Sequence, residues 1–265
     1  MTNVQNSYKK SSFGPAFLFL SSRRRAALAD YYEFCRLMDD IADEPREHPV
    51  QELTDWEEEV QRIFSNTAQT QLGKRLQQDV QSFHIEKDRF LLLIAGMKDD
   101  LNGKQYPTFD SLKEYLHRVA VVVGQGTLDI LGIKGPQADA LAWALGSAVQ
   151  LTNIVRDVLQ DARVGRVYLP GNWTAQQVLQ NAFRAQITPL LQQMAQRAHQ
   201  YYEDAFSLMK QFPSFKMLPC RIMGYVYLKN LAKIEKSGFY SEDSIRLSKP
   251  EKLQMVFYGI FKTFF

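Results

Sequence analysis

The amino-acid sequence predicts an all-α fold, built as a single helical bundle over residues 1–265. Apolar residues recur every three or four positions through most of the chain, which is typical of amphipathic helices. The segments between these stretches are short and rich in turn residues. Only one run, Val119 to Val123, has the β-branched composition of a strand. Because its flanks continue the helical spacing, we expect this run to be helical as well.

The expected helices follow one another with clear boundaries. In order, they cover residues 22–43, 51–65, 70–80, 86–101, 108–131, 136–163, 173–211 with an interruption, and 214–236. Helices end where Pro or Gly cannot continue them. The turn sequences that separate them include Glu44-Pro45, Asn102-Gly103, Gly132 to Pro136, Gly165 to Gly171, and Phe212-Pro213. The fifth helix should begin at a capping sequence, with Glu114 three residues after Ser111.

Composition excludes several classes of protein. The net charge is +3 and no long basic run is present, which argues against a nucleic-acid binder. Cys35 and Cys220 lie far apart without metal-ligand spacing, which argues against a disulfide framework or a zinc site. No apolar stretch reaches the roughly 18 to 20 residues of a membrane span. The short apolar run near the N-terminus contains Gly14-Pro15 and leads into Arg23 to Arg25, unlike a signal peptide.

We therefore expect a cytoplasmic protein. The C-terminal segment, LQMVFYGIFKTFF, leaves two readings open. It is either a last helix that packs on the core or a helix that contacts a membrane surface, which would make the protein peripherally membrane-bound. The oligomeric state is not predicted.

Two segments place polar side chains on a helix face where a core-facing helix would carry apolar ones. In CRLMDDIADE and the residues before it, Tyr32, Arg36, Asp39 and Asp43 follow one another at offsets 0, 4, 7 and 11. Like charges one turn apart repel each other. Asp40 is a candidate for the same site. The sequence leaves open whether Asp39 or Asp40 is the main ligand there.

The second segment is SAVQLTNIVRDVLQDARVGRVYLP. Here Gln150, Asn153, Asp157 and Asp161 run down one face at offsets 0, 3, 7 and 11, with apolar neighbours on both sides. Carboxylates and amides buried without partners are costly. A lone pair of helical aspartates is usually just solvated. Two such elements, each with an adjacent arginine, favour a shared functional site.

A hard divalent cation is the natural partner of these carboxylates. Mg²⁺ prefers oxygen ligands and typically takes one or two carboxylates, phosphate oxygens and waters. Two facing helices of this kind could hold a diphosphate between their metal ions. Arg36 and Arg156 lie beside the two acid sets and suit bidentate contacts to phosphate. Gly124 and Gly126 form a GxG pattern, but no strand precedes them, so a nucleotide fingerprint is not expected.

These segments resemble the two aspartate-rich motifs of the squalene/phytoene synthase family, class I isoprenoid synthases that join two prenyl diphosphates head to head. QLTNIVRDVLQDARVGRVYLP matches the family pattern at each fixed position. SSF at 11–13 is similar to the N-terminal substrate motif, and GKQYPTFDSLKEYLHRVAVVVG is similar to a family helix. The resemblance covers roughly residues 7 to 170 well and implies an all-α bundle around a central cavity, with bound Mg²⁺, or Mn²⁺ as an alternative.

The resemblance also implies residue roles. Metal ligands would be drawn from Asp39, Asp40, Asp43, Asn153, Asp157 and Asp161. Catalysis would involve Asp39, Asp43, Asp157 and Asp161 with Tyr32 and Tyr227. The substrates would contact Ser12, Phe13, Arg36, Gln150, Arg156 and Arg166, and Arg246 would stand in for a late phosphate-binding arginine. Val121 and Gln125 depart from the family pattern on a helix that faces the cavity in relatives. Asp99 and Asp100 are expected to form a solvated helix end.

The implied reaction condenses two farnesyl diphosphates to a cyclopropylcarbinyl diphosphate such as presqualene diphosphate, with onward rearrangement to a C30 hydrocarbon as an option. Use of NADPH is not favoured. Three alternatives stay open: a phytoene synthase acting on geranylgeranyl diphosphate, a class I terpene cyclase, and a non-catalytic assembly relative. The residues of RLMDDIADE and DARVGRVYLP favour a synthase of the presqualene diphosphate type.

Overall fold

The computed structural model describes residues 20–264, and all regular structure in that range is helical, as the sequence predicted. Ser12 and Phe13 lie outside the described residues. The long helices in chain order are α2 (Ser22–Asp43), α3 (Pro49–Phe64), α4 (Gln71–Phe83), α5 (Asp88–Leu101), α6 (Phe109–Leu116), α7 (Val122–Leu131), α8 (Pro136–Arg156), α11 (Arg184–Leu208), α12 (Ser214–Lys236) and α13 (Lys249–Phe264). Short helical segments join them: η3 (His117–Val121), α9 (Val158–Arg163), α10 (Ala175–Leu179), η4 (Asn181–Phe183) and η5 (Met209–Gln211).

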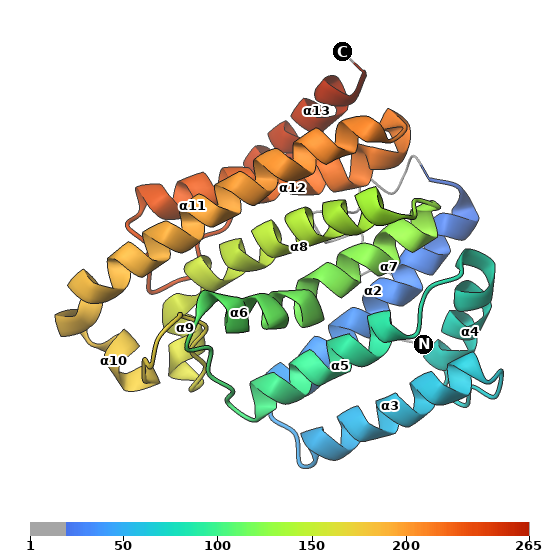
Figure 1. Ribbon diagram of the computed structural model, residues 1–265, viewed down its shortest axis with the longest axis horizontal. Coiled ribbons are helices and arrows are strands. Elements are labelled where there is room, and N and C mark those ends of the chain that lie inside the picture. Colours follow the sequence, from blue (N-terminus) through green and yellow to red (C-terminus); the bar gives the residue numbers. More distant parts are fainter. Residues whose placement is uncertain (1–19, 265) are drawn as a thin grey trace.

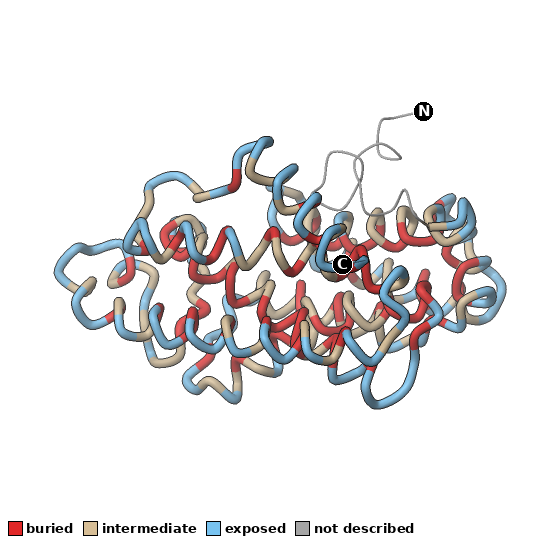
Figure 2. The backbone as a smooth tube through the Cα atoms, turned by 90° about the horizontal axis from the view of Figure 1, so that it is seen from above, coloured by how far each residue is buried: buried red, intermediate tan, exposed pale blue. Residues whose placement is uncertain are grey.

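Helix α8 lies at the centre of the bundle. Figure 1 shows α7 on one side of it and the layer of α11 and α12 on the other, and both sides pack against it. Helices α2 and α5 form the next layer, with α3 and α4 outside them. Figure 2 shows that the buried positions lie along the inward faces of the helices. One continuous hydrophobic core connects residues from Ala27 to Phe239.

Helix boundaries follow from local backbone and capping chemistry. Glu44 leaves the helical region at φ −92° and ψ 147°, the extended conformation that a following proline favours, and α2 ends there. At the start of α6 the Thr108 side chain accepts a hydrogen bond from the Ser111 backbone amide. The reciprocal contact comes from Ser111 itself and not from Glu114, because Thr108, and not Ser111, is the N-cap residue.

The β-branched run is helical, as expected, but its first half is wound as a π-helix over His117–Val121. π-segments within helices are rare and often occur beside functional sites. Gly146 of α8 lies directly against this segment, since a Cβ at Gly146 would come within 2.9 Å of the Ala120 carbonyl oxygen. The absence of a side chain at Gly146 therefore lets α8 approach the π-segment closely.

The single helix expected over residues 136–163 is divided at Asp157. This residue has φ −105° and ψ 16°, so α8 ends at Arg156 and α9 begins at Val158. Hydrogen bonds still cross the break, from the Asp157 amide to the Asn153 carbonyl (2.9 Å) and from the Asp161 amide to the Asp157 carbonyl (2.8 Å). The side chains of Asn153, Asp157 and Asp161 therefore still lie on the same face of the helix despite the break.

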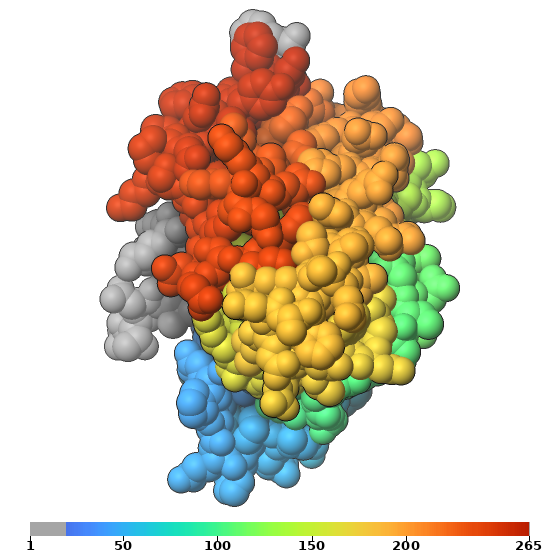
Figure 3. All heavy atoms as spheres, turned by 90° about the vertical axis from the view of Figure 1, so that its left-hand side faces the viewer, coloured from blue at the N-terminus to red at the C-terminus, as the bar shows by residue number. Residues whose placement is uncertain are grey.

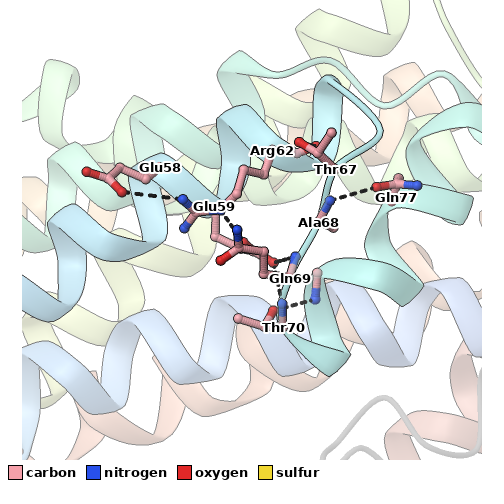
Figure 4. A network of polar contacts seen from close by, with 9 residues as sticks. Glu58, Glu59, Arg62, Thr67, Ala68, Gln69, Thr70 and Gln77 are labelled. Atoms are coloured by element: carbon pink, nitrogen blue, oxygen red, sulfur yellow. Dashed lines mark hydrogen bonds and ion pairs between the residues drawn. The ribbon is translucent and has the colours of Figure 1, made fainter.

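A buried carboxylate fixes the turn between α3 and α4 (Figure 4). Glu59 is almost fully buried and accepts hydrogen bonds from the backbone amides of Gln69 (2.8 Å) and Thr70 (2.7 Å). Arg62 donates to the other oxygen of the same carboxylate at 2.8 Å. Three donors thus offset the cost of burying this charge. The contacts hold α3 and α4 together as a pair, which packs on α5 through α3 and on α2 through α4.

The two glycines of the GxG pattern should respond oppositely to alanine. A Cβ at Gly126 would lie 2.4 Å from the buried Tyr31 ring, whereas a Cβ at Gly124 would meet Ala142 at an ordinary 3.5 Å. Overpacking of this kind lowers the free energy of unfolding by about 1–3 kcal/mol. Gly126→Ala should therefore lower the denaturant midpoint, while Gly124→Ala, which gains helix propensity, should leave it unchanged or raise it. Equal effects of the two substitutions would contradict this packing.

Candidate active site

A cavity of about 700 Å³ runs between the walls made by α2, α5, the η3–α7 helix and α8. This volume lies within the range of sites that enclose small organic ligands. Residues of α12, the segment after it and α13 also line the cavity, including Tyr227, Arg246 and Lys252. Segments from nearly the whole length of the chain therefore meet at one space.

The cavity has a polar end and an apolar end. On α2, Leu28 and Asp39 both line it, and eleven residues of helix separate them by about 16 Å. On α8, Leu141 and Asn153 are separated by a similar length. In both helices the polar residues come last in the chain. The C-terminal ends of α2 and α8 therefore supply the polar end, and their N-terminal halves help to form an apolar chamber.

The first acidic stripe points into the polar end through Asp39 and Asp43. Asp40 does not line the cavity. Its carboxylate instead forms an ion pair with Arg36, one helical turn away, at 2.6 Å. The structure thus separates two neighbouring acids that the sequence could not distinguish, and Asp39 is the one that faces the second wall.

The second stripe contributes Gln150, Asn153, Asp157 and Asp161, all of which line the cavity. The Asn153 amide nitrogen donates to Gln150 at 3.1 Å, while the Asn153 oxygen is buried and has no hydrogen-bond partner. Such an unsatisfied buried acceptor is unusual in a folded protein. It is the kind of oxygen that a bound cation would satisfy.

Two arginines bracket the acids. Arg156 forms a bidentate contact with Asp157, its neighbour in the chain, at 2.9 and 3.0 Å from Nε. Arg166, in the segment after α9, donates to Asp43 at 2.5 Å and to the Ala42 carbonyl at 2.7 Å. Arg166 therefore ties the end of α2 to the wall that carries Asp161.

A segment that follows α12 closes over α9 (Figure 3, orange-red over yellow). Gln160 donates to the Glu242 carbonyl at 3.0 Å, and Arg163 pairs with the Glu242 carboxylate. Ser244 donates to Asp157 at 2.5 Å. Asp157 is thereby held from two sides, whereas the Asp161 carboxylate forms no ion pair within residues 20–264 and is only partly compensated by the charge of Arg166.

Burial and mutual repulsion perturb these acids strongly. Burial, with the charge of Asp43 adding to it, raises the pKa of Asp39 to about 7. Burial and the neighbouring Asp157 raise the pKa of Asp161 to about 8, and Asp43 and Asp100 contribute in the same direction. Since acids of α2, α5 and α9 raise each other's pKa, the walls that carry them face one another closely.

Comparison with known proteins agrees with this geometry. The family model described as squalene/phytoene synthase matches residues 8–251. The chain belongs to the squalene/phytoene synthase family. A "Presqualene diphosphate synthase" of Rhodopseudomonas palustris is 31% identical over 258 residues, which cover 93% of this chain and 91% of the relative. "Phytoene synthase 2, chloroplastic" of Solanum lycopersicum is 34% identical over 263 residues, covering 93% and 84%.

Solved structures show the same family fold. A dehydrosqualene synthase in complex with ligand superposes with a TM-score of 0.84 at 24% identity, over 98% of this chain and 94% of that one. A squalene synthase from Alicyclobacillus acidocaldarius gives a TM-score of 0.78 at 24% identity, over 89% and 92%. The expected all-α isoprenoid synthase fold of the family is therefore confirmed.

Asp100 was expected at a solvated helix end, and this family member places it instead in the cavity wall. Its carboxylate accepts hydrogen bonds from Tyr115 (3.1 Å) and Tyr168 (2.7 Å), whose rings stack with centroids 4.8 Å apart. Burial raises the pKa of Asp100 to about 6. The signal was present in the sequence, because Phe90, Leu93 and Met97 form a buried stripe of α5 that Asp100 extends by one further turn.

The two positions that depart from the family pattern do not line the cavity. Val121 is buried but does not line the cavity, and Gln125 points outward to accept from Arg89 (2.8 Å) and donate to Asp139 (2.8 Å). Val119, Val123 and Thr127 line the apolar chamber instead. The π-turn at residues 117–121 shifts the register of this helix, so that neighbouring positions face the cavity.

The predicted tyrosines do meet at the cavity. Tyr32 of α2 and Tyr227 of α12 both line it and affect each other's ionisation. Burial raises the pKa of Tyr227, which Arg156 and Arg246 partly offset. Both phenols therefore stay protonated near neutral pH. Arg246 lines the cavity as well, together with Lys252, which no sequence pattern had indicated.

The perturbed acids should make folding stability depend on pH. A carboxyl whose folded pKa lies above its ordinary value near 4 stabilises the fold at low pH, and that stability is lost as pH rises through the folded pKa. For Asp39 and Asp161 this loss should extend to about pH 7 and about pH 8, respectively. In metal-free buffer, thermal unfolding should therefore shift to lower temperature between pH 5 and pH 8.5, roughly the span of these pKa values.

The double variant Asp39→Asn, Asp161→Asn is the matched comparison. Neither amide titrates, so the decline of melting temperature with pH should be visibly flatter than in the parent protein. Asp110→Asn, which removes an exposed acid whose pKa its hydrogen bond with Lys113 lowers, is the control and should leave the slope unchanged over this pH range. Asp79, a further acid whose pKa burial raises to about 7, contributes to the slope in the parent and in both variants. A double variant with the parent slope would show that these two acids do not titrate as described.

Proposed function

We propose that this protein condenses two prenyl diphosphates, farnesyl diphosphate in the first instance, head to head into a cyclopropylcarbinyl diphosphate such as presqualene diphosphate. One observation carries the proposal: a single cavity joins a chamber of apolar side chains to an end that holds two facing acid sets with arginines between them. This polarity matches a substrate with a hydrocarbon tail and a diphosphate head. Family membership and the naming of the R. palustris relative support the same reaction.

We propose that Asp39, Asp43, Asn153, Asp157 and Asp161 hold Mg²⁺, with Mn²⁺ as the alternative. The unsatisfied oxygen of Asn153 and the raised pKa values of Asp39 and Asp161 fit a site made for cations. Among residues 20–264, no three His, Cys, Asp or Glu side chains lie close enough to hold a metal ion by themselves. Phosphate oxygens and waters would complete the ligand set, as is typical of Mg²⁺. When bound, the ion supplies Lewis-acid stabilisation of the departing diphosphate.

The arginines bind the phosphate oxygens. Arg156 and Arg166 now pair with Asp157 and Asp43, and these partners would release them as cations neutralise the acids. Arg36 lies on the cavity wall and can turn from Asp40 toward a phosphate, since its side chain is half exposed. A guanidinium suits bidentate contact with phosphate, and Gln150 adds an amide donor.

Ionisation of the bound allylic diphosphate breaks a C–O bond, and the electron pair leaves with the diphosphate. The apolar chamber keeps water from the resulting allylic cation. Aromatic faces of Tyr32 and Tyr227 can stabilise its charge. The double bond of the second substrate attacks the cation, and loss of one proton closes the cyclopropane ring. The released diphosphate is a suitable base, with Tyr32 or Tyr227 relaying the proton.

Asp100 and its tyrosines form part of this proposal. The hydrogen bonds from Tyr115 and Tyr168 fix two rings at the polar end, where they can face the substrate carbon that bears the charge. Use of NADPH is not favoured. Onward rearrangement to a C30 hydrocarbon, a cytoplasmic location and peripheral membrane contact remain predictions. None of the described helices is both long and apolar enough to cross a bilayer.

Product analysis tests the proposal directly. Purified protein with farnesyl diphosphate and Mg²⁺ should yield presqualene diphosphate or a C30 product derived from it. A C40 product from geranylgeranyl diphosphate alone would favour the phytoene synthase alternative, and a cyclic product from one substrate molecule would favour a terpene cyclase. If neither substrate yields a product, the proposed condensation is contradicted and a non-catalytic role is supported.

Neighbouring acids provide the matched variants. Asp39→Asn should lower the rate of condensation by at least about a hundredfold, because it removes a proposed metal ligand. Asp40→Asn, one residue away but off the cavity wall, should change it only a few-fold. A larger effect at Asp40 than at Asp39 would contradict the assignment of Asp39 as the leading acid.

A further inference from the structure

Helix α13 is apolar on two opposite faces. Val256, Gly259 and Thr263 are buried against α12, and a Cβ at Gly259 would come within 2.8 Å of Ile222. The other face exposes large apolar residues: Leu253, Phe257, Tyr258, Phe261 and Phe264. A helix that is apolar all round normally has both faces covered. On the second face, the side chains of Leu253, Phe257 and Phe264 are more than half exposed.

The exposed residues form a continuous ridge. Leu253, Phe257, Phe261 and Phe264 follow one another at offsets 0, 4, 8 and 11, which places them along one side of the helix. Phe257 is 63% exposed and Leu253 is 53% exposed. Phe215, near the start of the adjacent α12, is also exposed. Figure 1 shows α13 at the outer edge of the bundle, beside α12.

The lysines and arginines of α12 and α13, here called the basic rim, accompany this ridge. Helices α12 and α13 together carry eight lysines and arginines against two glutamates, although the whole chain has a net charge of only +3. The remainder of the chain is therefore slightly acidic. Lys262 lies over the Tyr258 ring at 5.9 Å, and Arg221 of α12 donates to the Lys262 carbonyl at 2.6 Å. Glu251, the single acid of α13, is already paired with Lys233.

We propose that the ridge and its basic rim dock the protein onto an anionic lipid surface. A helix with an aromatic and leucine face beside lysines and arginines binds in the plane of the membrane interface. Sixteen residues give α13 a length of about 24 Å, enough to lie along the surface with its ridge inserted. A second copy of the chain is a poorer occupant, because a two-fold contact would bring the same basic rims together.

Docking here would bring the cavity close to the lipid. Lys252 lines the cavity, and the next residue in α13, Leu253, starts the exposed ridge. The benefit of such docking rests on the proposed function. A C30 or longer product is far more soluble in a bilayer than in water, so it could pass from the cavity into the membrane. The ridge itself lies beyond residue 251, where the family match ends. The ridge is therefore a feature of this chain outside the family match.

Vesicle co-sedimentation of the full-length protein tests the proposal. Binding to phosphatidylcholine vesicles that contain phosphatidylglycerol should be strong at low salt and weaker at high salt, since charge attraction is screened. Binding to vesicles of phosphatidylcholine alone should be much weaker. Leu253→Ser with Phe257→Ser should weaken binding to the anionic vesicles by roughly tenfold or more, because two inserted side chains lose their apolar contact.

The control replaces two exposed apolar residues that lie outside α12 and α13, Val50→Ser with Val164→Ser. This variant should bind like the parent protein. Lys249→Gln with Lys262→Gln should reduce the difference between anionic and neutral vesicles. The proposal would be overturned if the parent protein does not bind anionic vesicles. It would also be overturned if the ridge variant binds them as well as the parent does. Loss of a dimer in the ridge variant without any lipid binding by the parent would assign the ridge to a second copy instead.

Condensation activity measured on the same samples in vesicle-free buffer keeps the two proposals apart. Leu253 and Phe257 do not line the cavity, so the ridge variant should turn over prenyl diphosphate at the parent rate. An active protein that does not bind lipid contradicts only the docking surface. An inactive protein that does bind lipid contradicts only the proposed reaction.

Discussion

Repulsion among carboxylates at the ends of two helices is the constraint on which the rest of this structure depends. Asp39 and Asp43 occupy the last turns of α2, and Asp157 terminates α8. The C-terminal end of a helix already carries partial negative charge, so acids there are destabilised twice. Burial adds a third cost, seen in the raised pKa values of Asp39 and Asp161. Such an arrangement is stable only when protons, arginines or bound cations neutralise it.

The fold supplies part of that neutralisation and leaves part of it open. Arg166 holds Asp43, Arg156 and Ser244 hold Asp157, and two tyrosines hold Asp100. Asp161 and the oxygen of Asn153 are left to an outside partner. A diphosphate that arrives with its metal ions brings both the positive charge these acids need and the negative charge the arginines need. Stability is given up at the polar end, and the large hydrophobic core around α8 offsets it.

Much of this arrangement could be predicted from the sequence, because helical spacing determines which side chains share a face. The two acidic stripes, which include Tyr32 and Arg36, and the neighbouring Arg156 were recognised in this way. The family resemblance implied Tyr227 and the common cavity, and all of these residues line it. Spacing could not separate Asp39 from Asp40, since both neighbours fit a helix face and only tertiary packing turns Asp40 outward. Asp100 was misjudged because a charged residue at a helix end is usually solvated, and its tyrosine partners come from distant segments.

Local backbone irregularities explain the remaining differences. The π-turn at His117–Val121 rotates the helix that follows, so Val123 and Thr127 face the cavity and Gln125 does not. The break at Asp157 likewise has no signal in the apolar pattern, which continues through it. Both irregularities lie beside the cavity. Departures from regular structure are expected where function and not stability selects the residues.

Calorimetric titration of Mg²⁺ in the presence and absence of inorganic diphosphate tests the central claim most directly. If the facing acids form one half of a site that diphosphate completes, Mg²⁺ should bind at least about tenfold more tightly with diphosphate present. The enhancement should disappear in Asp39→Asn, Asp161→Asn and persist in Asp40→Asn. Equal Mg²⁺ affinity with and without diphosphate, or an enhancement that survives the double substitution, would contradict the account.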